Sequence, residues 1–169
     1  MAARSTPRYL STRLRFNVAD VGEPGSCQCT TCRKQTGCLL SQSFTVKSSQ
    51  MNLSLESHSA YKQYRSSPGA PRGFWSDCGS ALTFSWDSQP ERFEVWLGSL
   101  DEKWVIGDKV AGTEKETTYG RVVEHRGGII KELYGNADNI FFENAIVGMT
   151  DKLPSKKFLT RPQDGTSSE

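Results

Sequence analysis

Residues Cys27–Gly37 read CQCTTCRKQTG, and this stretch places three of the chain's five cysteines in the spacing C-x-C-x-x-C. Free cysteines often pack as small apolar residues, but such crowding by chance is unexpected. Zn²⁺ binds thiolates in a tetrahedral shell, which is closed in structural sites and keeps one open position in catalytic sites. Since one segment can present all three sulfurs to one ion, we predict a metal site at Cys27, Cys29 and Cys32.

Two other interpretations of these cysteines stay open. Cys29 and Cys32 have the spacing of a redox pair, but the βαβ context of a thioredoxin-like motif is absent. Three separately packed thiols would need no shared function. Disulfides are disfavoured, because Cys27 and Cys29 lie too close for good geometry and the N-terminus lacks the apolar stretch of a secretory signal. We therefore expect reduced thiols.

A short helix is expected directly after the cluster. Thr30 or Thr31 can cap its first turn, and Gly37 can end it after about two turns. Cys32 then lies in the first turn, where the helix dipole favours a thiolate over a thiol.

Two basic residues on this expected helix are the candidate catalytic residues. Arg33 and Lys34 favour a thiolate nearby and could steer a carboxylate-bearing substrate towards the cluster. The alternative interpretation is that both are solvated charges on the outer face of the helix.

A site with three sulfurs has either a remote fourth ligand or an open position. Four side chains elsewhere are candidates for the remote ligand: Cys38, Cys78, His58 and His125. We expect both histidines to be ordinary surface or turn residues and Cys38 to be a packed thiol. The fourth position is therefore left undecided by the sequence.

Away from the cluster, apolar and polar residues alternate in short runs, as expected for strands separated by turns. These runs are Leu10–Val18, Met51–Leu55, Leu82–Trp86 and Phe93–Leu97. We predict a mainly β fold with few short helices. It is expected to form a single domain over residues 1–160, followed by a flexible tail over 161–169.

Turn residues and apolar runs add three local predictions. Gly127–Gly128 tolerates positive φ and predicts a tight hairpin between Tyr119–His125 and Ile129–Leu133. Ser66–Gly73, which reads SSPGAPRG, is expected to be a loop by its composition. Ile140–Val147, which reads IFFENAIV, is expected to be a late apolar strand.

Charge and hydropathy argue against several kinds of partner. The chain of 169 residues has 21 Lys and Arg against 19 Asp and Glu, a net charge of +2. Without a basic patch, neither nucleic acid nor an anionic membrane surface is expected as a partner. No apolar run approaches the ~18 residues of a membrane span, so we expect a soluble, cytoplasmic protein. Exposed strand edges are consistent with a homodimer.

The first 19 residues carry arginines and no acidic residue, as mitochondrial presequences do. However, Leu10–Val18 alternates with period 2, whereas an amphipathic presequence helix has period 3.6. We therefore expect a strand at this position.

Four segments together resemble one family. They are CQCTTCRKQTG (27–37), DCGSAL (77–82), GSLD (98–101) and NIFFENAIVGMTDKLP (139–154). In this order they are similar to the glutathione-dependent formaldehyde-activating enzyme family, which also includes centromere protein V. The resemblance implies a zinc-binding, mainly β fold known as the β-tent. It also implies carbon–sulfur lyase chemistry on a small glutathione adduct.

Members of this family typically carry two metal sites, and the resemblance assigns the three-cysteine cluster to the site near glutathione. The other is a structural zinc held by a C-x-C pair and a C-x-x-C pair. Those positions fall here on Tyr9, Ser11, Trp75 and Cys78. Since only Cys78 remains, we predict one zinc per chain and no structural zinc. Tyr9 and Trp75 are expected to fill that volume, each burial contributing about 2–3 kcal/mol.

Two further departures from the family affect the expected substrate. Asn139 stands where the family often has His, and Trp104–Asn136 is a charged elaboration between GSLD and the last motif. Both are expected to reshape a pocket, so the use of glutathione does not follow from the resemblance.

Three functions are therefore weighed. The leading one is a zinc-dependent carbon–sulfur lyase-like enzyme acting on a thiol–aldehyde adduct, such as S-hydroxymethylglutathione. The second is a pathway enzyme of the same fold that converts an electrophilic carbonyl or imine intermediate without glutathione. The third is a non-catalytic zinc-binding interaction module, for which the neutral composition argues against nucleic acid.

Overall fold

A computed structural model describes residues 22–50, 57–134 and 137–161. Its strands are β1 (Pro24–Cys27), β2 (Ser41–Lys47), β3 (Tyr61–Ser67), β4 (Ala70–Trp75), β5 (Ala81–Trp86), β6 (Gln89–Trp96), β7 (Gly107–Lys109), β8 (Lys115–Thr117), β9 (Gly120–Val122), β10 (His125–Gly127) and β11 (Asp138–Ile140). Its helices are α1 (Thr30–Thr36), α2 (Glu102–Val105) and α3 (Ile130–Tyr134), with 3₁₀ turns at Ser48–Gln50, Leu97–Ser99 and Phe142–Asn144. This confirms the predicted mainly β fold with short helices. Within the described ranges, no helix has the length and apolar character needed to cross a membrane.

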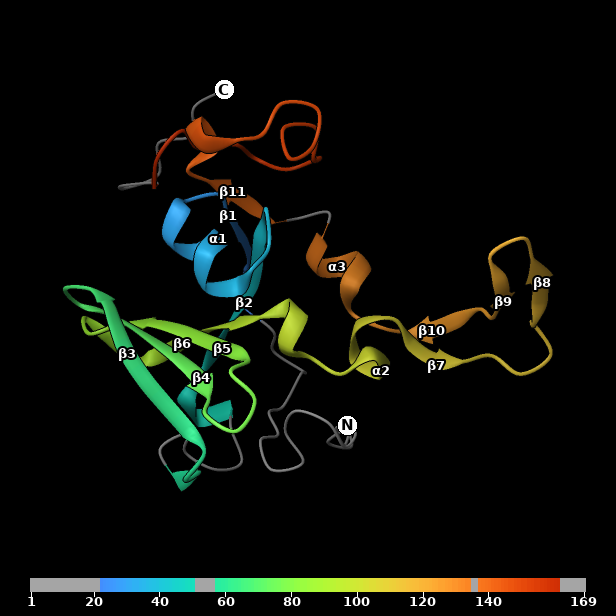
Figure 1. Ribbon diagram of the computed structural model, residues 1–169, viewed down its shortest axis with the longest axis horizontal. Helices are drawn as coiled ribbons and strands as arrows, with labels where there is room; N and C mark the ends of the chain where they lie inside the picture. Colours follow the sequence, from blue (N-terminus) through green and yellow to red (C-terminus); the bar gives the residue numbers. More distant parts are fainter. Residues whose placement is uncertain (1–21, 51–56, 135–136, 162–169) are drawn as a thin grey trace.

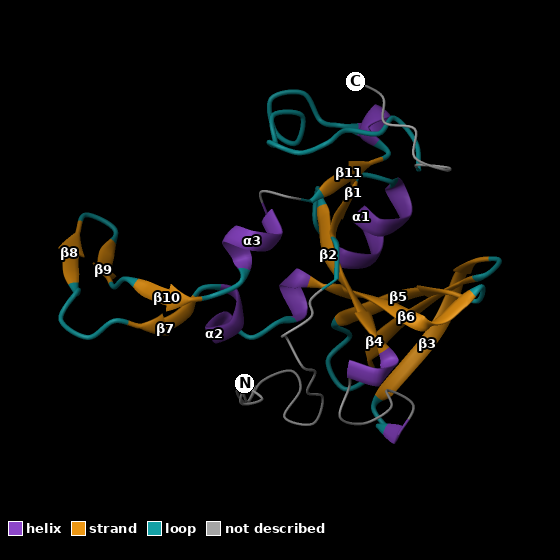
Figure 2. Cartoon of the chain, turned by 180° about the vertical axis from the view of Figure 1, so that it is seen from behind, coloured by secondary structure: helices purple, strands orange, loops and turns teal. Residues whose placement is uncertain are grey.

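Seven strands form the main sheet in the order β11-β1-β2-β6-β5-β4-β3. Neighbouring strands are antiparallel except for β1 and β11, which run parallel. Figure 1 shows β3–β6 at one end of this sheet, and β1, β11 and α1 at the other. The same separation is visible from behind in Figure 2. The cysteine segment therefore lies at the end of the sheet where the chain's early and late parts meet.

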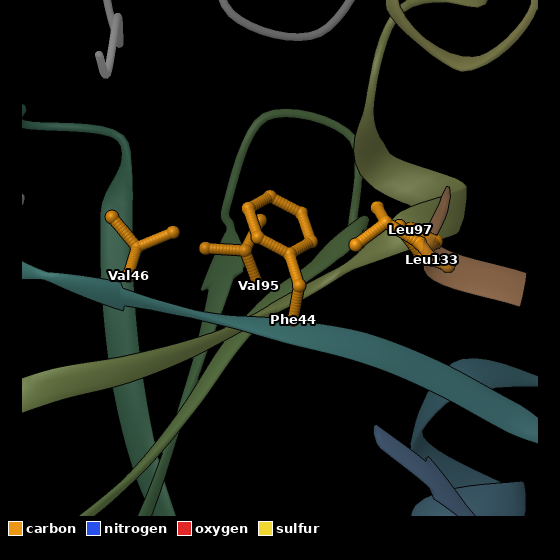
Figure 3. Packing of buried hydrophobic residues seen from close by; sticks show 5 residues of the cluster. All are labelled: Phe44, Val46, Val95, Leu97 and Leu133. Carbon is orange, nitrogen blue, oxygen red and sulfur yellow. The ribbon is translucent and has the colours of Figure 1, made fainter. Parts of the chain in front are cut away.

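A buried apolar cluster joins the middle of the sheet to α3. Figure 3 shows its five members, which are Phe44 and Val46 of β2, Val95 of β6, Leu97 of the 3₁₀ turn after β6, and Leu133 of α3. Phe44 and Val95 are direct cross-strand partners, and Phe44 is completely buried. Burial of such an aromatic side chain contributes about 2–3 kcal/mol relative to exposure. This packing fixes β2, and β2 in turn supports β1.

The sequence predicted two central strands correctly and missed a hairpin. Leu82–Trp86 lies in β5, and Phe93–Leu97 lies in β6 except for its last residue. The predicted loop over Ser66–Gly73 is wrong, because β3 and β4 pair through most of it. Only Pro68 and Gly69 form the turn, with φ of 70° at Gly69. A Pro-Gly pair suits such a turn, since Pro fixes the first dihedral and Gly accepts positive φ.

The predicted hairpin around Gly127–Gly128 is also wrong. β10 pairs with β7, earlier in the chain, and β8 pairs with β9. Figure 1 shows these short strand pairs extending away from the main sheet. The predicted second strand becomes α3 from Ile130 onward, because Ile129, Ile130 and Leu133 are spaced to place one apolar face against the central cluster.

The late strand predicted over Ile140–Val147 is wrong beyond its first residue. β11 ends at Ile140, and Phe141 adopts a left-handed conformation with φ of 57°. A left-handed residue cannot continue a strand, so the chain turns into the 3₁₀ segment Phe142–Asn144. The strands predicted over Leu10–Val18 and Met51–Leu55 lie outside the described residues, as does all of the predicted tail after its first residue.

Gly73 marks the tightest contact within the β3–β5 region. A Cβ atom at this position would overlap the side chains of Tyr61 and Thr83, whose hydroxyls are hydrogen-bonded to each other at 2.8 Å. We expect Gly73→Ala to lower the free energy of unfolding by about 1–3 kcal/mol, since it overpacks a buried contact. Gly98→Ala is the matched control, because no atom lies within 4 Å of its added Cβ. Thermal unfolding of both variants checks this, and equal melting temperatures would contradict it.

Candidate metal centre

The three clustered cysteines come together in space. Cys27 ends β1, Cys29 precedes α1, and Cys32 lies in the first turn of α1. Their Sγ atoms all lie within 4.8 Å of one another. Cys27 and Cys32 are buried, whereas Cys29 is partly exposed. The sequence prediction of one segment presenting three sulfurs to a common point therefore agrees with the structure.

The short link between β1 and α1 directs the sulfurs. Cys27 pairs with Ser41 of β2 on one side and with Ile140 of β11 on the other. The next residue, Gln28, continues this contact by donating its backbone N–H to the Ile140 carbonyl at 3.1 Å. Because side chains alternate along extended chain, Cys27 and Cys29 project to one side while Gln28 projects to the other.

The cap of α1 differs from the prediction. The N-cap is Cys29, not Thr30 or Thr31, and its Sγ accepts the backbone N–H of Cys32 at 3.3 Å. At the other end Gly37 has φ of 70° and donates its N–H to the Arg33 carbonyl at 2.9 Å. The predicted end at Gly37 and the place of Cys32 in the first turn are confirmed. A cysteine at the N-cap joins the helix start directly to the cluster.

The sulfur with the strongest thiolate character is Cys29, whereas the sequence favoured Cys32. Hydrogen bonds donated by the Cys27 and Cys32 thiols lower the pKa of Cys29 to about 2. The pKa of Cys27 is raised by its hydrogen bond to Cys29, by Cys32 and by burial. The hydrogen bond with Cys27 lowers the pKa of Cys32, but its bond to Cys29 and burial raise it overall. Without a metal, the thiolate form is thus favoured at Cys29 and disfavoured at Cys27 and Cys32.

The donor set fits a thiophilic divalent ion. Sulfurs about 2.3 Å from one tetrahedral ion lie close to one another, as the three Sγ atoms within 4.8 Å do. Thiolates are the soft ligands that zinc sites in proteins use most. Among the residues that the structure describes, this is the one group of three such side chains able to hold a metal ion.

The four candidates for a remote ligand lie apart from this group. None of them belongs to the described set of converging ligand atoms. Cys38 is exposed, so the expectation of a packed thiol is wrong, and its Sγ contacts the Thr36 carbonyl. Cys78 is exposed as well and contacts the Ser80 hydroxyl. His58 is buried against Trp75, with ring centres 5.8 Å apart, and His125 lies in β10.

A cavity of about 250 Å³ opens beside the thiols. All three cysteines line it, together with four aromatic rings: Phe84, Trp86, Trp96 and Phe141. Phe84 and Trp86 meet edge to face with ring centres 4.9 Å apart. A small molecule in this cavity would therefore lie between the sulfurs and a largely aromatic wall.

Four charged side chains also line the cavity: Arg72, Glu94, Asp138 and Arg161. Arg33 and Lys34 do not, so the structure does not bring these candidate catalytic residues to the cavity beside the thiols. Sequence reasoning missed Arg72, because it placed this residue in a loop. The Pro-Gly turn before it was the available signal, since it predicts a hairpin that returns β4 along β3.

The residues that depart from the family pattern lie elsewhere. Neither Asn139 nor any described residue of Trp104–Asn136 lines the cavity, so the expectation that they reshape the pocket stays a prediction. Asn139 is completely buried and accepts a hydrogen bond from Gln28 at 3.1 Å. Trp75 packs against the cluster of Tyr61, Leu82 and Phe93. Tyr9 and Ser11 lie outside the described residues, so the loss of the structural zinc stays a prediction.

Comparison with known proteins identifies the family. The model of the family described as glutathione-dependent formaldehyde-activating enzyme matches residues 11–116, well over half of the chain. The chain belongs to this family. The match includes the three clustered cysteines, whereas the last segment of the resemblance, residues 139–154, lies beyond it. Membership of an enzyme family named for glutathione supports enzymatic activity on a small molecule.

Other comparisons add less to the family assignment. No curated protein matches the chain. A crystal structure of a Rhodobacter sphaeroides protein is 21% identical, and the alignment covers 53% of this chain and 79% of that one. The TM-score of this alignment is 0.37.

Metal analysis of the purified chain tests the site. We expect about one zinc per chain in the wild type, and loss of zinc in Cys27→Ser, Cys29→Ser and Cys32→Ser, because each removes one of the converging ligands. Cys38→Ser is the matched control and should keep its zinc, since Cys38 lies outside the group. A wild type without zinc, or equal loss in the control, would contradict this assignment.

Proposed function

We propose that the chain binds one zinc ion through Cys27, Cys29 and Cys32 and acts as a carbon–sulfur lyase-like enzyme. Its substrate would be a thiol–aldehyde adduct of the glutathione–formaldehyde type. The observation that carries this proposal is the cavity of about 250 Å³ lined by all three sulfurs. A purely structural metal needs a closed ligand shell and no adjoining cavity.

The proposed reaction joins a thiol to an aldehyde, or separates them. In the joining direction the S–H bond breaks, a bond forms between sulfur and the carbonyl carbon, and the proton ends on the former carbonyl oxygen. When bound at the three sulfurs, zinc would favour the thiolate form of a substrate thiol at its open position. The aromatic side chains Phe84, Trp86 and Phe141 would exclude bulk water from the adduct.

Glu94 is the cavity residue that we assign to proton transfer. Its two carboxylate oxygens accept hydrogen bonds from Ser43 at 2.8 Å and from Thr45 at 3.1 Å. These bonds fix the orientation of the carboxylate at the cavity wall, and positioned carboxylates commonly act as general acid–base groups. Glu94 would carry the proton between the thiol sulfur and the aldehyde oxygen.

The two alternative functions have less support. A pathway enzyme that does not use glutathione was suggested by Asn139 and Trp104–Asn136, but their described residues lie outside the cavity lining. A non-catalytic zinc module would have no use for a cavity beside the sulfurs. The glutathione reaction is also the one that the family description names.

Exchange spectroscopy by NMR on glutathione and formaldehyde at equilibrium tests the reaction. We expect the zinc-loaded chain to accelerate interconversion of free glutathione and its hydroxymethyl adduct above the rate in buffer. Glu94→Gln should slow this exchange about a hundredfold while zinc stays bound, because the amide cannot carry the proton.

Cys29→Ser should abolish the acceleration together with zinc binding. Cys78→Ser serves as the control, because Cys78 is exposed and lies outside the converging ligand group. A fully zinc-loaded wild type that leaves the exchange rate at the buffer value would refute the glutathione reaction.

A further inference from the structure

Arg72 is a buried cation beside the thiol cluster. It lies in β4 directly opposite Phe84 of β5, and only 4% of its surface is exposed. Its guanidinium carbon lies 4.9 Å from the centre of the Phe84 ring. Arginine stays protonated in proteins, so a full positive charge is fixed in the wall of the cavity.

The contacts of Arg72 include one group that can be an anion. Its Nε donates to the Ser66 hydroxyl at 2.6 Å, and its Nη1 donates to the Gln35 amide oxygen at 2.7 Å. Both of these partners are neutral. Its Nη2 donates to the Sγ of Cys32 at 3.4 Å. Among these three partners, the sulfur is therefore the one able to supply a counter-charge.

No described carboxylate forms an ion pair with Arg72. The ion pairs found within the described residues join other side chains, and none includes Arg72. A buried charge is costly unless an opposite charge accompanies it. Negative charge on the neighbouring cysteine cluster would therefore offset the cost of burying the Arg72 guanidinium.

The charge of the cluster changes what can bind beside it. Three thiolates around a divalent ion leave one net negative charge. Such a site opposes a fourth ligand that is itself an anion, because like charges repel strongly in a poorly hydrated environment. The guanidinium of Arg72 adds one positive charge, so the loaded cluster and its neighbour are neutral together.

We propose that Arg72 is a positioning residue that balances the third thiolate of the loaded cluster and so permits an anionic thiolate to bind as the fourth ligand. The inference rests on the proposed function, because it requires a divalent ion with an open position. It deepens that function by stating that the thiol substrate binds as an anion. Substrate thiolate and cluster would otherwise repel each other.

A purely structural role for Arg72 makes a different prediction. Through Ser66 and Gln35 its side chain also ties β3 to α1, and loss of this tie would disturb every ligand at the site alike. A charge-balancing role affects anionic ligands selectively. Ligands of different charge at the same open position therefore separate the two roles.

The experiment uses the full chain loaded with Co²⁺, whose visible absorption reports a change of ligand. 2-Mercaptoethanol, which binds as a thiolate, and imidazole, which binds as a neutral ligand, are titrated separately. We expect Arg72→Gln to weaken thiolate binding at least about tenfold and imidazole binding less than about threefold. Arg72→Lys should recover part of the thiolate affinity, since it keeps the charge.

Gln35→Glu is a second variant that removes no contact of Arg72. It gives the guanidinium a carboxylate partner where an amide oxygen now accepts its hydrogen bond, and so cancels its charge in place. We expect a loss of thiolate affinity similar to that of Arg72→Gln. Arg65→Gln is the matched control, because it changes the net charge by as much as Arg72→Gln and Gln35→Glu do, but at an exposed ion pair with Asp87. It should alter neither the thiolate nor the imidazole affinity.

The outcomes separate this inference from the proposed function. If the wild type binds Co²⁺ and both ligands but Gln35→Glu lowers both affinities equally, or neither, the inference is overturned and the proposed function stands. If Arg72→Gln does not fold, Gln35→Glu decides alone. If the wild type binds no Co²⁺, or binds it without accepting either ligand, the proposed function fails and the inference fails with it.

Discussion

The hydrogen bonds of Gln28 hold the turn from which the three sulfurs converge. Its side chain is completely buried, donates to the amide oxygen of Asn139 at 3.1 Å and accepts from the Thr150 hydroxyl at 2.6 Å. Buried polar groups are costly when unpaired, so this network fixes the residue between Cys27 and Cys29 in one orientation. It also joins the start of the described chain to residues 111 and 122 positions later. The geometry of the cysteine cluster thus depends on the late segment being in place.

Electrostatics explains how this turn can be both stable and reactive. Hydrogen bonds from Cys27 and Cys32 lower the pKa of Cys29, while the pKa values of Cys27 and Cys32 themselves are raised. Binding of a metal ion to all three sulfurs would displace the protons that Cys27 and Cys32 retain. A buried guanidinium 3.4 Å from the Cys32 sulfur favours the added negative charge. The fold thereby brings three ligands for a thiophilic ion together and leaves a cavity beside them.

The sequence predicted those features that depend on local spacing. The C-x-C-x-x-C spacing and the glycine at position 37 were enough to predict the cysteine cluster and the helix after it. The alternation of apolar and polar residues was enough to predict β5 and β6. Features that depend on distant contacts were missed. Ile130–Tyr134 is helical because the central cluster accepts its apolar face. Phe141 ends β11 through a left-handed conformation that its residue type disfavours. Arg72 enters the site only because β4 lies beside β5, a pairing that spacing near the cysteines does not reveal.

The central claim is that three sulfurs hold a zinc ion whose fourth position is open to a small ligand. X-ray absorption spectroscopy at the zinc edge of the native chain tests it most directly, because it counts sulfur and lighter ligands separately. The account predicts three sulfurs at about 2.3 Å and one oxygen or nitrogen ligand, with one sulfur more when a thiol substrate is added. Four sulfurs without added thiol, or fewer than three, would contradict it.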